Sequence, residues 1–446
     1  MRVSAATGAP RLDRSSWPAP PRPVRIVHIG IGNFSRAHQA WYTMAADGAG
    51  EWGICAFTGR RPDAAQALAP QQGLYTLIER SSATDSLSVI EVLSEVRPGS
   101  DLDGFVTAVA APQTAIVTLT VTEAGYRPTA AAERGSSGAG RAAAGPEHGS
   151  PSPPERLATA LVERCRRGAP PLAIVSCDNL HENGRVLRER TIAVAERLDA
   201  KAADWISREV SFVNTSVDRI TPRITDADRA LVTRELGLVD VSPVVTEPFS
   251  DWILSGEFPA GRPRWESAGA RFVAEIEPWE LRKLWILNGA HSLLAFLGLL
   301  RGYQTVLDAI RDPELVQAME EFWDLAQRHL PNAAELDLSA YRSETHARFA
   351  NARMGYPLRQ IAGDGRDKLR QRVVPVIEAA LDAGDCAEPA LRVVRAWAQW
   401  LLADAARVET DQNAELLRSV LHAGGGEDRT RGLLGLLTPR LAGIDP

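Results

Sequence analysis

The sequence predicts an α/β protein made of an N-terminal Rossmann-like, doubly wound domain and a mostly α-helical C-terminal domain. Three observations predict this fold class. Apolar, β-branched runs in the first half alternate with helical stretches, which is typical of a parallel sheet covered on both faces. A glycine turn follows the first run. In the last third, apolar residues recur at helical spacing with few strand signals.

The N-terminal part is expected to contain strands at 24–30 (VRIVHIG), 52–58 (WGICAFT), 115–121 (AIVTLTV) and 172–176 (LAIVS). Residues 1–23 are expected to form an irregular lead-in, and a helix is expected from about 35 to 46. The stretch 127–154 is dominated by Gly, Ala, Ser and Pro, which cannot bury a core. It is expected to be a flexible surface loop without a function of its own.

The C-terminal part is expected to begin near residue 275, which divides the chain into domains 1–275 and 276–446. With 446 residues the chain is too long for one ordinary domain. Three segments after Pro278 have apolar residues at helical spacing: WELRKLWILNGAHSLLAFLGLL, PELVQAMEEFWDLAQRHL and PALRVVRAWAQWLLADAARV. These segments predict the helices of a substrate-binding and catalytic domain.

Composition narrows the class of protein. Hydrophobic residues make up 45% and charged residues 24% of the chain, as in a soluble enzyme. A net charge of −6 and a pI near 5.9 disfavour nucleic acids and anionic membranes as partners. No apolar run reaches the length of about 18 residues that a membrane span needs. The expected partner is a small molecule, and the expected state is a monomer or small homo-oligomer.

The cysteines suggest neither a disulfide framework nor a zinc cluster. The chain has four of them, far apart and without a CxxC pair: Cys55, Cys165, Cys177 and Cys386. The N-terminus has no apolar stretch that would serve as a signal peptide. We therefore expect a cytoplasmic protein that works without a metal.

The glycine turn after the first strand is the candidate dinucleotide site. It reads Gly30-Ile31-Gly32-Asn33-Phe34-Ser35, with glycine where the turn is tight and where the backbone must approach a pyrophosphate. Ser35 stands where the third glycine of the pattern is usual, and it is small enough for close helix packing. An ordinary strand–helix turn remains the alternative.

The residues after the second strand bear on the choice between NAD and NADP. An acid there binds the ribose diol of NAD, whereas arginines accommodate the 2′-phosphate of NADP. This chain has Arg60 and Arg61 and no acid before Asp63, which favours NADP weakly. The alternative is two solvated surface arginines, so NAD and NADP both stay open.

Two polar segments in the N-terminal part are candidates for chemistry. Asn179 follows the buried strand 172–176, and ligands bind outside the carboxyl ends of strands in open α/β sheets. The alternative is that Asp178 and Asn179 form a turn and cap a helix. The second segment contains Asp218, which either lies at the active site or forms an ion pair with Arg219.

The most informative candidates lie in the helix after Pro278. With α-helical geometry, Asn288 lies roughly 140° and His291 about 80° around the helix from Lys283. The residues between them are apolar, which predicts a buried helix, and burial lowers the pKa of a lysine. A neutral Lys283 accepts a hydroxyl proton, while Asn179 and Asn288 donate to the developing alkoxide. The alternative is a buried ion pair with a capped histidine.

These residues resemble the polyol-specific long-chain dehydrogenases, the mannitol dehydrogenase family, over nearly the whole chain. The resemblance rests on IVHIGIGNFSRAHQAWY (26–42), GLYTLIER (73–80), TVTEAGY (120–126), SCDNLHENG (176–184), NTSVDRITPR (214–223), EPFSDWILSGEFPAGRPRWE (247–266) and KLWILNGAHSLLAFLG (283–298). The pattern K-x4-N-x2-H is the family's catalytic signature.

The resemblance implies roles for individual residues. Lys283 is implied to be the general base, Asn179 and Asn288 the oxyanion pair, and His291 a substrate ligand. Asp218, Arg348 and Lys368 are expected to bind substrate. Cofactor contacts are expected from Gly30, Gly32, Asn33, Phe34, Arg60, Thr122 and Glu123. The family works without a metal.

Departures from the family pattern leave the substrate open. Mannitol-type members carry Arg-Ile-Ala where this chain has Gln360-Ile361-Ala362, which resembles the mannonate (fructuronate) oxidoreductases instead. Arg366 stands in place of a serine and Thr246 in place of a cysteine. The expected reaction is the interconversion of mannitol and fructose or of mannonate and fructuronate.

Four other functions are alternatives to this one. A mannitol-1-phosphate 5-dehydrogenase would need further basic residues in its pocket. A 6-phosphogluconate-type β-hydroxyacid dehydrogenase also uses a lysine and an asparagine on a helix, and would release CO2. A zinc alcohol dehydrogenase fits poorly because Cys177 and His181 lack further well-spaced ligands. A nucleotide-binding sensor without turnover would not need Lys283, Asn288 and His291 together.

Overall fold

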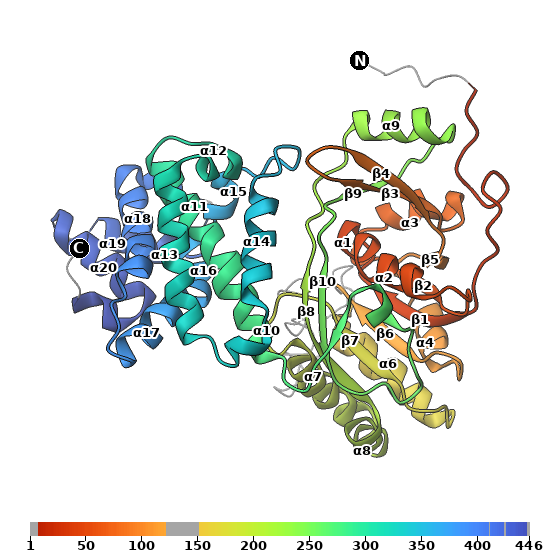
Figure 1. Ribbon diagram of the computed structural model, residues 1–446. Coiled ribbons are helices and arrows are strands. Elements are labelled where there is room, and N and C mark those ends of the chain that lie inside the picture. Colours follow the sequence, from red (N-terminus) through yellow and green to blue (C-terminus); the bar gives the residue numbers. More distant parts are fainter. Residues whose placement is uncertain (1–7, 122–150, 410, 423–424, 444–446) are drawn as a thin grey trace, which may run out of the picture. The chain divides into compact units, whose positions relative to one another are not determined.

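The computed structural model describes residues 8–121, 151–409, 411–422 and 425–443. Contacts within the chain divide it into two compact units, Met1–Ile276 and Glu277–Pro446 (Figure 1). The first unit is built on a mainly parallel sheet, and the second consists of helices. This confirms the predicted fold class, a Rossmann-type domain with a mostly helical C-terminal domain.

The larger sheet of the N-terminal unit has eight strands among the described residues, in the order β11-β10-β8-β7-β6-β1-β2-β5. Its strands are β1 (Val24–Ile29), β2 (Gly53–Phe57), β5 (Leu93–Arg97), β6 (Ile116–Leu119), β7 (Ala173–Ser176), β8 (Ser211–Asp218), β10 (Asp251–Ser255) and β11 (Arg271–Phe272). The four strands expected from the sequence are β1, β2, β6 and β7, each within two residues of its predicted ends.

The six strands from β5 to β8 are parallel to their neighbours, and β10 adds to β8 in the antiparallel direction. Numbered by their order in the chain, the parallel strands run 3-2-1-4-5-6, the order of dinucleotide-binding Rossmann domains. The order reverses between β1 and β6. In open α/β sheets, ligands bind at this reversal, outside the carboxyl ends of the strands.

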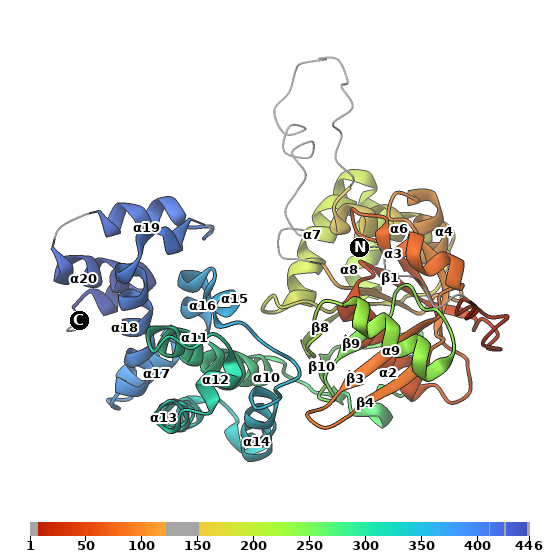
Figure 2. The same cartoon turned by 90° about the horizontal axis from the view of Figure 1, so that it is seen from above.

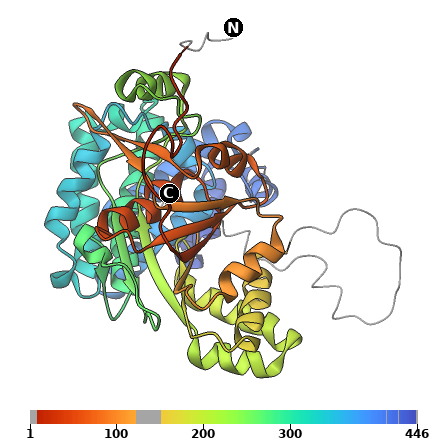
Figure 3. The same ribbon diagram turned by 90° about the vertical axis from the view of Figure 1, so that its right-hand side faces the viewer.

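Both faces of the sheet are buried, because alternate residues of each strand enter different cores. Val27, Phe57 and Leu119 pack under a helical layer, whereas Ile26, Ile54 and Ile116 face the other core with Trp252 and Trp265. The helical layer consists of α4 (Leu102–Ala110), α6 (Pro153–Arg166), α7 (Asn183–Leu198) and α8 (Ala200–Glu209), which lie together in Figures 2 and 3. The opposite face is covered by α1 (Asn33–Ala37), α2 (Gln39–Ala46) and the short 3-10 helix Trp265–Ala268.

The helix expected from 35 to 46 is in fact two helices, α1 and α2, separated at His38. Tertiary contacts explain the break, because the His38 ring lies within 5.3 Å of the Trp252 ring and its Nε2 lies 3.0 Å from the Asp251 carbonyl oxygen. The flexible loop expected at 127–154 falls mostly outside the described residues. Its last two residues, Pro153 and Pro154, begin α6, with Ser152 and Glu155 forming a capping box.

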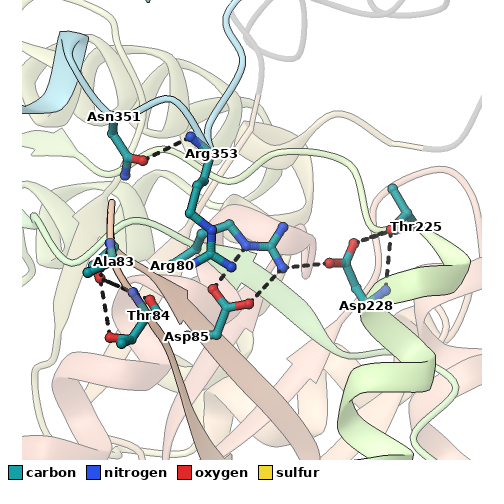
Figure 4. Close-up of polar contacts among 9 residues, drawn as sticks. Arg80, Ala83, Thr84, Asp85, Thr225, Asp228, Asn351 and Arg353 are labelled. Atoms are coloured by element: carbon teal, nitrogen blue, oxygen red, sulfur yellow. Dashed lines mark hydrogen bonds and ion pairs between the residues drawn. The ribbon is translucent and has the colours of Figure 1, made fainter.

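A second, three-stranded sheet supports the first and was not predicted. It consists of β3 (Tyr75–Arg80), β4 (Asp85–Ile90) and β9 (Val244–Thr246). Figure 4 shows the Arg80 guanidinium between Asp85 on β4 and Asp228 on α9 (Asp226–Leu236). Thr225 caps α9 by accepting from the Asp228 amide. The remaining helices among the described residues of this unit are α3 (Asp63–Leu68) and the 3-10 turn Ala69–Gln71.

The described residues of the C-terminal unit form helices and turns around a core that includes Phe296, Phe322, Trp323 and Trp397. The helices are α10 (Glu277–Arg282), a π-helical segment (Lys283–Gly289), α11 (Ala290–Leu300), α12 (Val306–Ile310), α13 (Pro313–His329), α14 (Leu338–Phe349), α15 (Leu358–Ala362), α16 (Gly365–Arg372), α17 (Val374–Asp382), α18 (Glu388–Ala403), α19 (Ala414–Leu421) and α20 (Gly426–Leu437). Short 3-10 turns cover Ala333–Glu335, Ala405–Val408 and Pro439–Gly443.

The continuous helix Glu277–Leu300 is the most apolar helix of this unit. It is 24 residues long with a mean hydropathy of 1.4 over 18 residues, so by length and composition alone it would cross a membrane. However, 61% of that window is buried inside the structure. The apolar side chains of this helix therefore serve the core of the C-terminal unit.

Candidate active site

The turn after β1 lies where the strand order reverses, and its first glycine is required by the backbone. Gly30 has φ +96°, and a Cβ on it would lie 2.4 Å from the carbonyl oxygen of Thr120 beyond β6. The amides of Gly30 and Ile31 both donate to the Phe57 carbonyl at the end of β2, at 2.9 and 3.0 Å. Glycine at residue 30 therefore lets the turn pack directly against the end of β6.

Ser35 does more in this turn than pack closely, which is what the sequence suggested. Its Oγ accepts from the Gly32 amide at 3.0 Å and returns a hydrogen bond to the Gly32 carbonyl at 3.3 Å. Gly32 is the residue that precedes α1, so the Ser35 side chain forms part of the N-terminal cap of this helix. The third position of the glycine pattern is therefore occupied by a capping side chain.

A buried histidine that sequence reasoning missed joins β1 to β6 beneath the turn. His28 Nδ1 lies 2.8 Å from Thr118 Oγ1, and its Nε2 lies 3.2 Å from Thr120 Oγ1. Thr120 Oγ1 in turn donates to the Gly30 carbonyl at 2.9 Å. Burial lowers the pKa of His28 to about 4. The ring is therefore neutral near pH 7, and it braces the turn without adding a charge.

The other expected cofactor residues fall into different environments. Asn33 Oδ1 accepts from the buried Arg36 guanidinium at 2.8 Å, and the Phe34 ring stacks on His38 at 5.0 Å. Arg60 is exposed beyond β2, while the exposed Arg61 lies 3.7 Å from Asp63. Thr122 and Glu123 lie outside the described residues.

Asn179 lies directly after the carboxyl end of β7, as the sequence predicts. It is exposed, and the turn before it is made by Asp178, whose carboxylate accepts from the Leu180 amide at 3.0 Å. Neither residue caps α7, because Glu182 precedes that helix. Asp178 thus has the turn-forming role considered above, whereas the helix-capping alternative is wrong.

Asp218 ends β8 at the same edge of the sheet and is buried. The next residue, Arg219, has Glu79 on β3 as its carboxylate partner, at 2.9 Å. Its guanidinium also donates to the Ala37 and Glu247 carbonyls and lies over the Trp41 ring. Arg219 therefore ties β8 to α1 and to the small sheet, a role that its sequence context did not reveal.

The helix that carries Lys283, Asn288 and His291 is not a regular α-helix, which corrects the geometry assumed from the sequence. Residues Lys283–Gly289 form a π-helix, in which hydrogen bonds join residues five apart instead of four. This wider turn moves Asn288 closer to the face of Lys283 than α-helical geometry does. Buried Trp323 donates from Nε1 to the Ile286 carbonyl at 2.7 Å and so satisfies a π-helical acceptor.

Lys283, Asn288 and His291 are half-buried, whereas Trp285, Ile286 and Leu287 between them are buried. The sequence predicts a buried lysine, whereas Lys283 is half-buried in the structure. The three polar side chains instead share the partly exposed side of an otherwise buried helix.

The other C-terminal candidates lie on neighbouring helices. The His291 ring contacts the Phe349 ring of α14 at 4.5 Å, next to the buried Arg348. Lys368 on α16 donates from Nζ to the Ile361 carbonyl at 3.0 Å. Burial, with the nearby charge of Arg372, lowers the pKa of Lys368. The C-terminal unit thus carries the predicted base Lys283 with Asn288, His291, Arg348 and Lys368, and the N-terminal unit carries the cofactor turn, Asn179 and Asp218.

Among the described residues, no three His, Cys, Asp or Glu side chains come together in a way that would hold a metal ion. The four cysteines are free thiols.

Comparison with known proteins identifies both units. A family model for the mannitol dehydrogenase Rossmann domain matches residues 24–267, and one for the mannitol dehydrogenase C-terminal domain matches 275–435. The chain is 36% identical over 385 residues to D-mannonate oxidoreductase of Escherichia coli (strain K12), covering 83% of this chain and 78% of that protein. It is 33% identical over 374 residues to mannitol 2-dehydrogenase of Aspergillus fumigatus, covering 80% and 74%.

Solved structures agree with this assignment. Mannitol 2-dehydrogenase of Pseudomonas fluorescens, in a ternary complex with NAD and D-mannitol, matches with a TM-score of 0.74 and 31% identity over 95% of this chain and 92% of that one. A substrate-free D-sorbitol dehydrogenase matches with a TM-score of 0.81 and 27% identity over 95% and 91%. The chain therefore belongs to the mannitol dehydrogenase family of oxidoreductases.

Proposed function

We propose that the protein is an NAD- or NADP-dependent dehydrogenase that interconverts a secondary alcohol of a six-carbon polyol or aldonate and its 2-keto form. The mannitol/fructose and mannonate/fructuronate pairs are the two candidate reactions. The observation that carries the proposal is the π-helical segment, which gives Lys283, Asn288 and His291 one partly exposed side of a buried helix. The family membership supports the reaction class.

In the proposed reaction, the bound nicotinamide supplies the hydride acceptor. Lys283 Nζ takes the hydroxyl proton as the C–H hydride leaves, and the carbinol carbon becomes a ketone. Asn179 and Asn288 donate hydrogen bonds to the oxygen while it carries negative charge. His291, Asp218, Arg348 and Lys368 hold the other hydroxyl or carboxylate oxygens. No metal takes part in this scheme, so dialysis against a chelator should leave kcat unchanged.

The cofactor turn fits a dinucleotide because it lies where the strand order reverses, with Gly30 packed against the backbone of Thr120. Exposed Arg60 favours acceptance of a 2′-phosphate, and NAD is the cofactor named in the Pseudomonas fluorescens complex. An assay of both cofactors against mannitol, arabinitol, sorbitol, mannonate, altronate and mannitol 1-phosphate decides the substrate and the cofactor together. Turnover of none of them would contradict the proposal, and activity confined to mannitol 1-phosphate would favour the phosphate-specific alternative. Release of CO2 from 6-phosphogluconate would instead favour the β-hydroxyacid alternative.

Lys283→Ala tests the proposed base. We expect kcat to fall by about 10²- to 10⁴-fold, because general base catalysis contributes that much, while cofactor binding is kept. The chain has three lysines, and the exposed Lys201 on α8 gives the matched control Lys201→Ala, which should retain full activity. A Lys283→Ala variant that turns over like wild type would show that the base has been assigned to the wrong residue. Cofactor binding without turnover in the wild type would support the sensor alternative.

We also place the protein in the cytoplasm. Its four separate, free thiols fit a reducing compartment. A fusion to a fluorescent protein, viewed in cells, tests this location.

A further inference from the structure

The sheet has a gap beside Thr215, where β7 ends before β8 does. The last backbone pair between the two strands is Val175 with Val213, whereas β8 continues to Asp218. On its other edge, β8 is still paired at Thr215, which lies opposite Leu254 of β10. The Thr215 backbone amide and carbonyl are buried on the β7 side, and buried backbone groups need partners.

The side chain of Asn183, at the start of α7, supplies these partners. The Thr215 amide donates to Asn183 Oδ1 at 2.9 Å, and Asn183 Nδ2 donates to the Thr215 carbonyl at 2.9 Å. The same Nδ2 donates to the Asp178 carbonyl at 3.2 Å. Asn183 is fully buried, so its carboxamide takes the place of the next residue of β7.

Two further contacts hold the start of α7 against β8, and a third joins β8 to the end of β7. A Cβ on Gly184 would lie 2.6 Å from the Val213 carbonyl, so that position has no room for a side chain. The Arg185 amide donates to Asn214 Oδ1 at 3.1 Å, and Thr215 Oγ1 donates to the Ser176 carbonyl. Glu182, just before Asn183, has a left-handed backbone with φ +48°. A non-glycine residue in that conformation is strained, and it persists where its surroundings fix it.

We propose that Asn183 is a positioning residue that fixes Asn179 for catalysis. The Asp178 carbonyl that Asn183 binds belongs to the peptide unit shared by Asp178 and Asn179, so this hydrogen bond sets the direction in which the Asn179 side chain leaves the backbone. An oxyanion donor must lie within about 3 Å of the oxygen that it stabilises, and small displacements lower the rate. The inference rests on the proposed function, in which Asn179 is such a donor.

Asn183→Asp tests this role with little change of shape. The carboxylate still accepts from the Thr215 amide but donates to neither carbonyl, so the tie to the Asp178 peptide is lost. We expect the single-turnover rate of hydride transfer to fall by about tenfold or more, with cofactor affinity unchanged. In an Asn179→Ala background the same substitution should change the rate by less than about twofold, because the residue it positions is absent.

Two further variants complete the design. Thr215→Val removes the hydrogen bond from Thr215 Oγ1 to the Ser176 carbonyl at the end of β7. It should slow hydride transfer in the otherwise wild-type protein but not in the Asn179→Ala variant. This substitution replaces Asn183→Asp in the test if Asn183 variants do not fold. Thr191→Val is the matched control, since Thr191 is buried on the same helix and its hydroxyl has no hydrogen-bond partner in the described part of the chain. This variant should keep full activity.

The outcomes separate the inference from the proposed function. If Asn183→Asp slows the wild type and the Asn179→Ala variant by the same factor, Asn183 has only a general structural role. If Asn179→Ala is slow but Asn183→Asp is as fast as wild type, the positioning role is wrong while the proposed function stands. If Asn179→Ala turns over like wild type, the oxyanion role of Asn179 is wrong, and the positioning role falls with it.

Discussion

Lysine and arginine are used very differently along this chain. Among 50 basic residues there are three lysines, Lys201, Lys283 and Lys368, and two of these lie in the candidate site. An arginine stays protonated in proteins, whereas a lysine loses its proton when burial lowers its pKa. A proton acceptor at residue 283 therefore cannot be replaced by arginine. Where a basic side chain only has to donate hydrogen bonds, arginine suffices. Arg164, for example, is fully buried and donates to the Val109, Ala111, Thr114 and Pro170 carbonyls.

His28 makes stability depend on pH at the scale of a single residue. Burial lowers its pKa from the ordinary 6.5 to about 4, so between these values the unfolded chain binds a proton that the folded chain does not. The contribution of neutral His28 to the free energy of unfolding is therefore full above pH 6.5 and is lost as the pH falls toward 4. We expect the wild type to lose about 2 kcal/mol more than His28→Gln between pH 7 and 4.5.

Urea unfolding of both proteins at the two pH values, followed by tryptophan fluorescence, measures this difference. The comparison with His28→Gln removes the contribution of carboxylates that titrate in the same range. Parallel loss of stability in the two proteins would mean that the histidine is not kept neutral by burial.

At the scale of elements, the π-helical segment depends on helix α13 behind it. Trp323 of α13 binds the Ile286 carbonyl, and Phe322 lies so close to Gly289 that a Cβ there would be 2.6 Å from its ring. Helix α13 therefore fills the space behind the widened turn, and it leaves no room for a side chain at residue 289. The sequence did not reveal this, because a π-helical turn has the same apolar residues as an α-helical one.

Trp323→Phe should destabilise the C-terminal unit by about 1–3 kcal/mol beyond the loss of packing, since a buried carbonyl loses its donor. Trp285→Phe is the matched control, because the Trp285 indole N–H is buried without a hydrogen-bond partner in the described residues. Chemical unfolding of both variants gives the difference in free energy of unfolding. Equal losses would show that the Trp323 hydrogen bond adds nothing to stability.

At the scale of the whole molecule, the chain has two compact units, and the cofactor turn belongs to the first. A ligand stabilises the unit that binds it by about 2.7 kcal/mol at one hundred times its dissociation constant. We expect saturating NAD or NADP to slow amide hydrogen exchange in β1, β2 and β6, and to leave the core helices α17 and α18 unchanged. Gly30→Ala, whose Cβ meets the Thr120 carbonyl, should abolish this protection. Protection that persists in Gly30→Ala would place the cofactor elsewhere.

Much of this architecture could be predicted from the sequence, since β1, β2, β6 and β7 are continuous apolar runs buried on both faces. The small sheet was missed because β4 is not a continuous apolar run: its first four residues are half-buried or exposed, and only Val89 and Ile90 are buried. Asn183 was missed for another reason. An asparagine at a helix start is ordinary in sequence, and only the three-dimensional pairing with Thr215 shows that it completes a strand.

The π-helical segment changes the phase of the long helix Glu277–Leu300. A turn that closes after five residues holds one residue more than an α-helical turn, so the residues on either side of it are offset by roughly 100° relative to a regular helix. Regular α-helical winding of the same sequence would place His291 about 80° around the helix from Lys283, even though every side chain of the signature would still be present. The π-helical turn is thus as much a part of the proposed catalytic signature as the identity of its residues.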